Sequence, residues 1–175
     1  MLALPASVRL SCAPALATLR VVVVDSQVGV SLDYRDPRRE QVLKALEEGL
    51  TAEIQFQLRL YRRQPGFLRF LGDRLVVERR ISQTARYDSF EGRYRIRRQD
   101  RELAAYSEPG KALEAFCSLS DFPLADLSRE EAGEYYVAVR ARLTPVKMVA
   151  PLSLITLFLP HLAFSSPWLE GGVLP

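Results

Sequence analysis

The stretch with the strongest chemical signal is RYDSFEGRYRIRR, which runs from Arg86 to Arg98 and mixes arginines with three aromatic residues. A sheet that displays arginines between aromatic rings is one way to bind single-stranded nucleic acid. The stretch therefore raises the hypothesis of a surface for an anionic partner. The alternative is two antiparallel strands whose solvent-facing side happens to be rich in arginine.

The charge distribution along the chain is compatible with both interpretations. Net charge is only +3, yet the segment from Arg59 to Arg101 contains thirteen arginines and five acidic residues, so the rest of the chain is net negative. Such asymmetry within one domain can mark a surface for an anion. Arginine also outnumbers lysine by 21 to 3, and a genome rich in arginine codons produces the same pattern on any solvated face.

Alternation within the stretch predicts which side chains share a face. If Tyr94 points into the core, the arginines on either side of it point outward. The stacking mode needs exposed aromatic rings beside the arginines, so nucleic acid is not the expected partner, although a basic face remains. The predicted anion-binding face consists of Arg86, Arg93, Arg95, Arg97, Arg140 and Arg142, the last two on the condition that their strand belongs to the same sheet.

Groups suited to catalysis or metal binding are few. His161 is the single histidine, and a lone histidine makes neither a metal site nor a catalytic triad. Cys12 and Cys117 have no zinc or redox spacing, and Cys117 lies in an apolar helical context typical of a buried thiol. We predict no catalytic residue, no metal and no cofactor. An enzyme of unrecognised type stays as an alternative, which a pocket with converging polar groups would favour.

The N-terminal residues are apolar and small but do not form a typical signal peptide. Ala15-Leu16-Ala17 has the small-x-small form of a cleavage site, whereas no basic residue precedes the apolar run and Arg9 interrupts it. We expect residues 1–18 to be a leader or a disordered segment. The expected location is periplasmic or otherwise exported, with the cytoplasm as the alternative.

Hydrophobic periodicity predicts two helices among several strands. DPRREQVLKALEEGL, residues 36–50, has an aspartate and a proline suited to a helix start and Gly49 suited to its end. A second helix is expected over residues 108–119, with Leu113 and Phe116 buried, followed by a polar connection. Strands are expected at 20–34, 51–63, 75–87, 93–98, 103–106 and 134–143.

The segment TAEIQFQLRLYRR, residues 51–63, has the cleanest period of two. It predicts that Ile54, Phe56, Leu58 and Leu60 are core while Gln55, Gln57 and Arg59 face outward. Strands joined this tightly cannot be parallel, so the sheet is mainly antiparallel and one face needs a cover. The predicted fold class is α+β: a mainly antiparallel sheet or sandwich-like single domain over residues 19–169, with two helices and a proline-bearing apolar tail.

The C-terminal tail has no formally charged residue from Met148 to Leu169, a length that would span a bilayer. Three prolines interrupt it, so we expect no transmembrane span. Instead the tail is predicted to pack on the domain with Phe164 and Trp168 as anchors, leaving residues 170–175 as a flexible end.

Four segments in this order resemble a known bacterial family: KALEEGLTAEIQFQLRLYRR, ARYDSFEGRYRI, EYYVAVRARL and the final FSSPW. They resemble domain-of-unknown-function family 4390, with Gly49, Tyr87, Tyr136, Arg140 and Trp168 among the matching positions. The resemblance implies an exported protein with a signal sequence and a tail ending in a Ser-Trp-type motif, and it brings no catalytic residues. In some bacteria the family's gene lies beside a sensor-kinase gene, which associates it with envelope signalling.

The sequence thus predicts an exported, non-enzymatic binding or interaction domain at the bacterial cell envelope. Its partner would be an envelope protein or a polyanion. Two alternatives stay open: an anion-binding module for acidic lipid, envelope polymer or RNA, and an enzyme of unrecognised type.

Overall fold

The computed structural model describes residues 16–35, 39–128, 130–145 and 164–173. This part of the chain is rich in strands and has two α-helices and one 3-10 helix. In chain order the elements are β1 Leu16–Val24, β2 Gln27–Arg35, α1 Arg39–Glu47, β3 Thr51–Arg62, η1 Gly66–Leu71, β4 Arg74–Asp88, β5 Arg93–Arg98, β6 Arg101–Tyr106, α2 Pro109–Cys117, β7 Ser118–Asp126, β8 Tyr135–Pro145, β9 Phe164–Ser165 and β10 Leu169–Val173.

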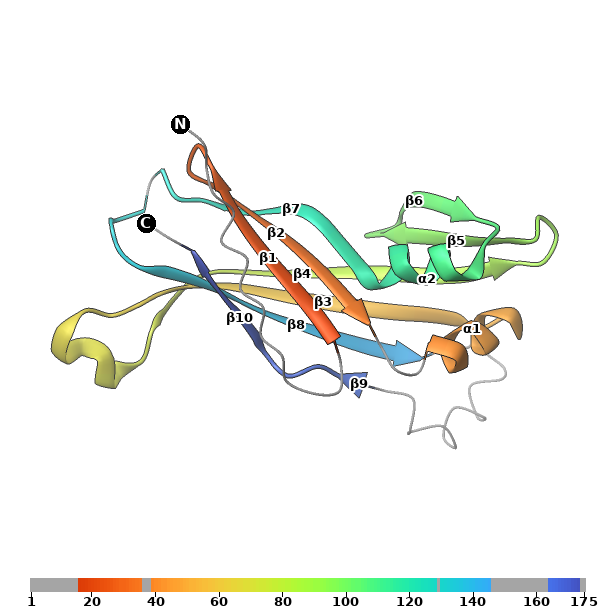
Figure 1. The fold of residues 1–175 in the computed structure, drawn as a ribbon, viewed down its shortest axis with the longest axis horizontal. Helices are drawn as coiled ribbons and strands as arrows, with labels where there is room; N and C mark the ends of the chain where they lie inside the picture. Colours follow the sequence, from red (N-terminus) through yellow and green to blue (C-terminus); the bar gives the residue numbers. More distant parts are fainter. Residues whose placement is uncertain (1–15, 36–38, 129, 146–163, 174–175) are drawn as a thin grey trace.

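The strands form two antiparallel sheets in two layers (Figure 1). The larger sheet has the order β10-β8-β3-β4-β5-β6, and β9 pairs with β8; the smaller sheet has the order β1-β2-β7 and lies over one face of the larger. Both helices cover that same face near the end where β4 turns into β5 (Figure 1). The predicted α+β class with a mainly antiparallel sheet is confirmed.

The core lies between the two layers and is built from alternate residues of the central strands. The four predicted residues of β3, Ile54, Phe56, Leu58 and Leu60, are each 0% exposed, which confirms the register. Tyr94 of β5 is also buried, as predicted. β2, in the opposite layer, contributes side chains to the same core, and so does β8, the strand that pairs with β3. The core residues of β2 are Val28, Val30, Leu32 and Tyr34, and those of β8 are Val137, Val139, Ala141 and Leu143.

One polar side chain, Gln83 of β4, lies fully buried in this core. Its amide nitrogen donates to the carbonyl oxygens of Phe116 (2.8 Å) and Ser118 (3.2 Å), and its oxygen accepts from Nε of Arg98 (2.6 Å). The last carbonyl groups of a helix have no partner within the helix. Gln83 therefore caps the end of α2 from the larger sheet, where the chain turns into β7. Burial lowers the pKa of Arg98.

The N-terminal part differs from the prediction of one strand over residues 20–34. It is a hairpin, with β1 and β2 joined by Asp25 and Ser26 at φ of 46° and 70°. Positive φ at both central residues fits the tight turns that suit the twist of a hairpin. The turn was missed because it contains neither glycine nor asparagine. β1 begins at Leu16, so the segment predicted as leader or disordered overlaps the first strand.

β7 was not predicted. α2 ends at Cys117 rather than at Leu119, and a strand replaces the polar connection. Its period of two is interrupted by register shifts against β2, by Asp121 at φ 44°, and by Pro123. These interruptions hide a strand that still buries Leu124.

Of the predicted flexible end, residues 170–173 instead belong to β10, which pairs with β8 through Val173, and residues 174–175 lie outside the described part. A Cβ on Gly171 would come within 3.0 Å of Cγ2 of Val21, so the glycine lets β10 lie against β1. Of the apolar tail, residues 146–163 lie outside the described part. Within the described ranges, neither helix has the length and apolar character needed to cross a membrane.

Candidate binding surface

All six predicted arginines lie on the outer face of the larger sheet, the face turned away from the smaller sheet. Arg86 is the cross-strand partner of Arg95, and Arg97 is opposite Thr84. On the other side of β3, Arg140 is opposite Gln57 and Arg142 is opposite Gln55. β8 therefore belongs to the same sheet as β5, which was the condition for including its two arginines.

These arginines do not form one continuous patch. β3 and β4 separate β8 from β5, and strands lie about 4.8 Å apart, so roughly 14 Å of sheet lies between the two groups. Side chains of the intervening strands, including Glu53 and Ser82, occupy this space, and Ser82 donates a hydrogen bond to Glu53 (3.1 Å). The outer face is basic at two separate places.

Arg95 is surrounded by acidic groups. Its guanidinium forms ion pairs with Glu91 (2.6 Å), Asp88 (3.3 Å) and Glu102 (3.3 Å). These carboxylates, Glu91 first, raise the pKa of Arg95. The pKa of Asp88 is lowered, mainly because the backbone N–H of Glu91 donates to its carboxylate. Arg97 in turn donates to the carbonyl oxygen of Asp100 (2.7 Å). The charge of Arg95 is thus largely balanced within the protein.

Three of the six arginines remain available. Arg86, Arg93 and Arg142 are exposed, and within the part of the chain that the structure describes they form neither an ion pair nor a hydrogen bond, whereas the exposed Arg97 is hydrogen-bonded to Asp100. Arg86 and Arg93 lie near each other at the β4–β5 end of the sheet, since their cross-strand partners are Arg95 and Asp88.

Arg140 has a structural role because it holds the C-terminal tail. Its Nε donates to Oγ of Ser165 (2.6 Å). The next residue, Ser166, is buried, and its backbone N–H donates to the carbonyl of Ala141 (2.8 Å) while its Oγ accepts from the N–H of Ala141 (3.0 Å). The two serines of FSSPW thus fasten the tail to β8.

Trp168 completes this attachment on the outer face. The guanidinium of Arg59 lies 4.7 Å from the centre of a Trp168 ring, and that of Arg140 lies 5.9 Å away. Cation–π contacts of this kind stabilise by about 0.5–1 kcal/mol each at exposed sites. We call Arg59, Arg140, Ser165, Ser166 and Trp168 the tail clamp. Two of its residues, Arg140 and Trp168, are among the positions that match the family.

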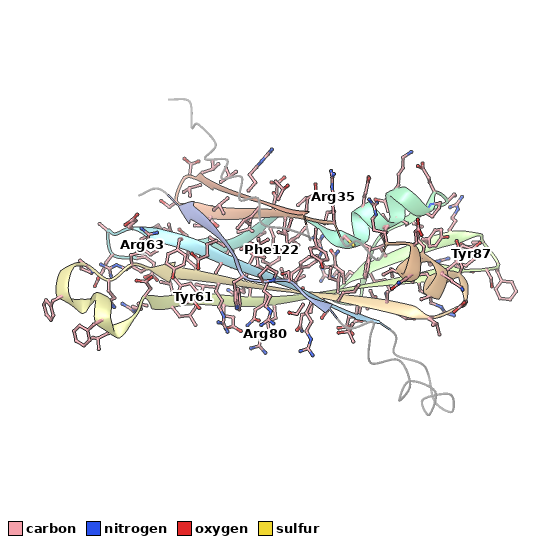
Figure 2. The ribbon with its side chains drawn as sticks, turned by 60° about the horizontal axis from the view of Figure 1, so that its bottom comes forward. Arg35, Tyr61, Arg63, Arg80, Tyr87 and Phe122 are labelled. Carbon is pink, nitrogen blue, oxygen red and sulfur yellow. The ribbon has the colours of Figure 1, made fainter. Side chains whose placement is uncertain are left out.

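The aromatic residues continue beyond the tail clamp along the outer face. The rings of Tyr61 and Tyr136 stack at 5.2 Å and 16°, and Arg63 lies 5.6 Å from the centre of Tyr136. Burial and the hydrogen bond from its hydroxyl to Asp73 (2.9 Å) raise the pKa of Tyr136 to about 12. Figure 2 shows Tyr61 and Arg80 on the side of the larger sheet opposite the smaller one. Aromatic rings thus lie between arginines on this face. The rings of Tyr61 and Tyr136 stack on each other.

The β3–β4 hairpin ends in an apolar tip. Its segment η1 projects beyond the rest of the molecule (Figure 1, yellow), with Phe67 80%, Phe70 77% and Leu71 67% exposed. Residues three apart share one face of a 3-10 helix, so Phe67 and Phe70 are aligned. With Leu75, 46% exposed at the start of β4, they form what we call the hairpin tip.

The base of this arm is held by several polar contacts. The backbone N–H of Gln64 donates to the carboxylate of Asp73 (3.2 Å) across the loop. Arg63 pairs with Glu134 (3.0 Å) and Arg62 pairs with Glu131, so the hairpin is tied to the segment before β8. Sequence reasoning missed the tip; its signal is an apolar run between Pro65-Gly66 and Gly72-Asp73, two pairs of turn-forming residues.

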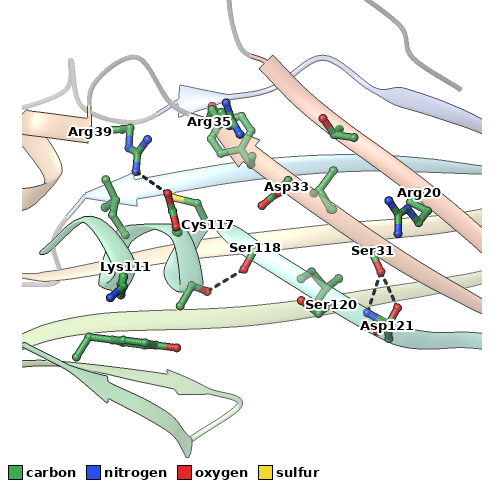
Figure 3. A pocket seen from close by; sticks show the side chains of 18 residues that line it. Arg20, Ser31, Asp33, Arg35, Arg39, Lys111, Cys117, Ser118, Ser120 and Asp121 are labelled. Carbon is green, nitrogen blue, oxygen red and sulfur yellow. Dashed lines mark hydrogen bonds and ion pairs between the residues drawn. The ribbon is translucent and has the colours of Figure 1, made fainter. Parts of the chain in front are cut away.

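A cavity of about 690 Å³ lies beside α2 on the outer side of the smaller sheet (Figure 3). Among its polar groups, Oγ of Ser31 donates to Asp121 (2.9 Å), and Arg39 forms an ion pair with Glu114 (3.9 Å). Cys117 lines it and is buried, as predicted. This cavity is the kind of feature that would favour an enzyme, but its charges are mixed and its polar groups do not converge on one point.

The chain matches the model of DUF4390, a domain of unknown function, over residues 14–170. It belongs to this family. No curated protein and no solved structure matches significantly. The region that matches DUF4390 includes the tail clamp, the hairpin tip and every described strand except most of β10.

Proposed function

We propose that this DUF4390 protein is an exported, non-enzymatic binding domain of the bacterial cell envelope that acts by contact through its hairpin tip. The observation that supports this is the exposure of Phe67, Phe70 and Leu71 at the end of a hairpin whose other half is buried in the core. The family resemblance implies export and supplies no catalytic residues, which supports the location and the absence of enzymatic activity.

The side chains of Phe67, Phe70 and Leu71 are mostly exposed, so they add little to the core. Contiguous exposed apolar residues on soluble proteins are commonly interaction sites. The ion pairs at the base of the arm hold it in an extended position, so the apolar end is presented to a partner without a prior conformational change. The tip lies at one end of the long axis of the molecule, and the β4–β5 turn with fully exposed Phe90 lies at the other (Figure 1).

Photo-crosslinking in living cells tests the contact. A photoreactive amino acid at position 67 should give crosslinks to an envelope component, while the same amino acid at position 90 serves as the matched control. Cell fractionation with determination of the mature N-terminus tests the location. Equal crosslinking at both positions, or recovery of the protein in the cytoplasm, would contradict the proposal.

A second candidate function, weak anion binding, is favoured by Arg86 and Arg93. Both are exposed near the β4–β5 turn and form no ion pair with any described residue. The partner would be an acidic lipid headgroup, an envelope polymer or RNA.

A further inference from the structure

We infer that the partner of the hairpin tip is a lipid bilayer, into whose interface Phe67, Phe70, Leu71 and Leu75 insert. This inference rests on the proposed function, in which the tip is the site of contact. It names the class of partner and the orientation in which the molecule meets it.

The size of the tip argues against a stable protein interface. A large aromatic side chain buries about 150–250 Å², so two phenylalanines and two leucines offer on the order of 500 Å². A standard protein interface buries about 800 Å² on each partner. The tip is also an end rather than a groove, since η1 projects from the hairpin (Figure 1). A bilayer accepts a convex apolar end without needing a complementary surface.

The residue types are those of interfacial insertion. Phenylalanine and leucine on one side, with arginine close by, are typical of segments that lie about 5–10 Å deep at the boundary of headgroups and acyl chains. Four apolar residues and one arginine follow Gly66 within η1, and Arg74 is exposed at the start of β4. A 3-10 helix also satisfies part of its backbone hydrogen bonding internally, which favours shallow insertion.

The charges near the tip predict how lipid composition affects binding. Arg62 and Arg63 are paired with Glu131 and Glu134, which leaves Arg74 as the exposed arginine beside the tip that can meet a lipid phosphate. Apolar insertion should therefore dominate, and anionic lipid should increase binding only modestly. This weak dependence on anionic lipid distinguishes the tip from the arginines at the β4–β5 turn. Those arginines lie at the opposite end of the molecule and would need an anionic surface.

Vesicle flotation tests the inference with the full-length protein. The variants are Phe67→Ser with Phe70→Ser, and as the control Phe90→Ser, which removes a fully exposed ring at the other end. Vesicles of phosphatidylcholine alone are compared with vesicles that also contain phosphatidylglycerol. Wild type and Phe90→Ser should float with both, and the double variant should lose at least about tenfold in partitioning. All three proteins should have the same melting temperature because the changed side chains are exposed.

The other outcomes overturn the inference in distinguishable ways. If wild type does not float while position 67 still crosslinks to a protein in cells, the tip is a contact site for a protein and the bilayer is the wrong partner. If Phe90→Ser loses as much as the double variant, insertion is not localised to the tip. If neither flotation nor crosslinking at position 67 is found, the proposed function falls together with this inference.

Discussion

The β3–β4 hairpin can be divided along its length into two halves, and the two differ in what covers them. In the half that includes Phe56 and Ile81, the smaller sheet and the helices lie over the inner face, and both residues are at most 1% exposed. In the half that ends in η1, Phe67 and Phe70 are about four-fifths exposed. Strand alternation determines which side a residue faces, whereas burial depends on whether a second layer reaches that part of the sheet.

Truncation of a phenylalanine in each half should give the largest difference. Phe56→Ala leaves a cavity in a fully buried site and should lower the free energy of unfolding by about 3–5 kcal/mol. Phe67→Ala should change it by less than about 0.5 kcal/mol because the ring is exposed. Chemical denaturation of the two variants measures the contrast, and similar losses would mean that the tip is part of the core.

The buried amide of Gln83 gives the next largest effect. Gln83→Leu leaves the carbonyls of Phe116 and Ser118 and the guanidinium of Arg98 without their partner, which should cost about 1–3 kcal/mol. Gln55→Leu makes the same chemical change on the outer face and should cost less. A Gln83→Leu variant as stable as wild type would show that the end of α2 needs no cap from the larger sheet.

Removal of Trp168 should affect the tail more than the whole domain. Trp168→Ala removes the cation–π contacts with Arg59 and Arg140, and we expect a loss of about 1 kcal/mol. Hydrogen exchange should become faster in β9 and β10 and stay unchanged in β2. Trp168→Phe keeps part of the contact and should give an intermediate effect; unchanged exchange in β10 would mean that pairing with β8 alone holds the tail.

Sequence patterns predicted the covered half of the molecule well because burial there follows alternation. The register of β3, the inward Tyr94 and the buried Phe116 all come from period-two or helical spacing near the centre of the fold. The β1–β2 turn was missed because Asp25 and Ser26 carry no glycine signal, and β7 was missed because its bulge and Pro123 break the period. The tip was missed because an apolar run in a loop does not reveal whether anything packs on it.

The six candidate arginines lie on one face, but their separate contacts follow from partners that are distant in sequence. Arg140 is engaged by Ser165 and Trp168, which depends on the tail returning to β8. Arg95 is engaged by Glu102 from the neighbouring strand as well as by local acids. No local pattern separates these two from Arg86 and Arg93, for which the described residues provide no ion pair or hydrogen bond.

The smallest effect on stability, and the sharpest test of the basic face, should come from Arg86 and Arg93. Changing both to Gln should leave the free energy of unfolding within about 0.5 kcal/mol because exposed charges contribute little. The matched control is Arg20→Gln with Arg79→Gln, which removes the same charge from exposed positions elsewhere; Arg79 is the cross-strand partner of the inward-facing Leu58. Heparin retention over a salt gradient then compares the two double variants with wild type.

If the β4–β5 end binds anions, the Arg86/Arg93 variant should elute at lower salt than the control. On a single-stranded oligonucleotide each lost phosphate contact should reduce the salt slope by about 0.7. Binding should be weak and should fade near physiological ionic strength because exposed charges are screened over about 8 Å there. Equal elution of the two variants would mean that retention reports net charge alone. The arginines of this end would then be a solvated face, and the hairpin tip would remain as the candidate contact.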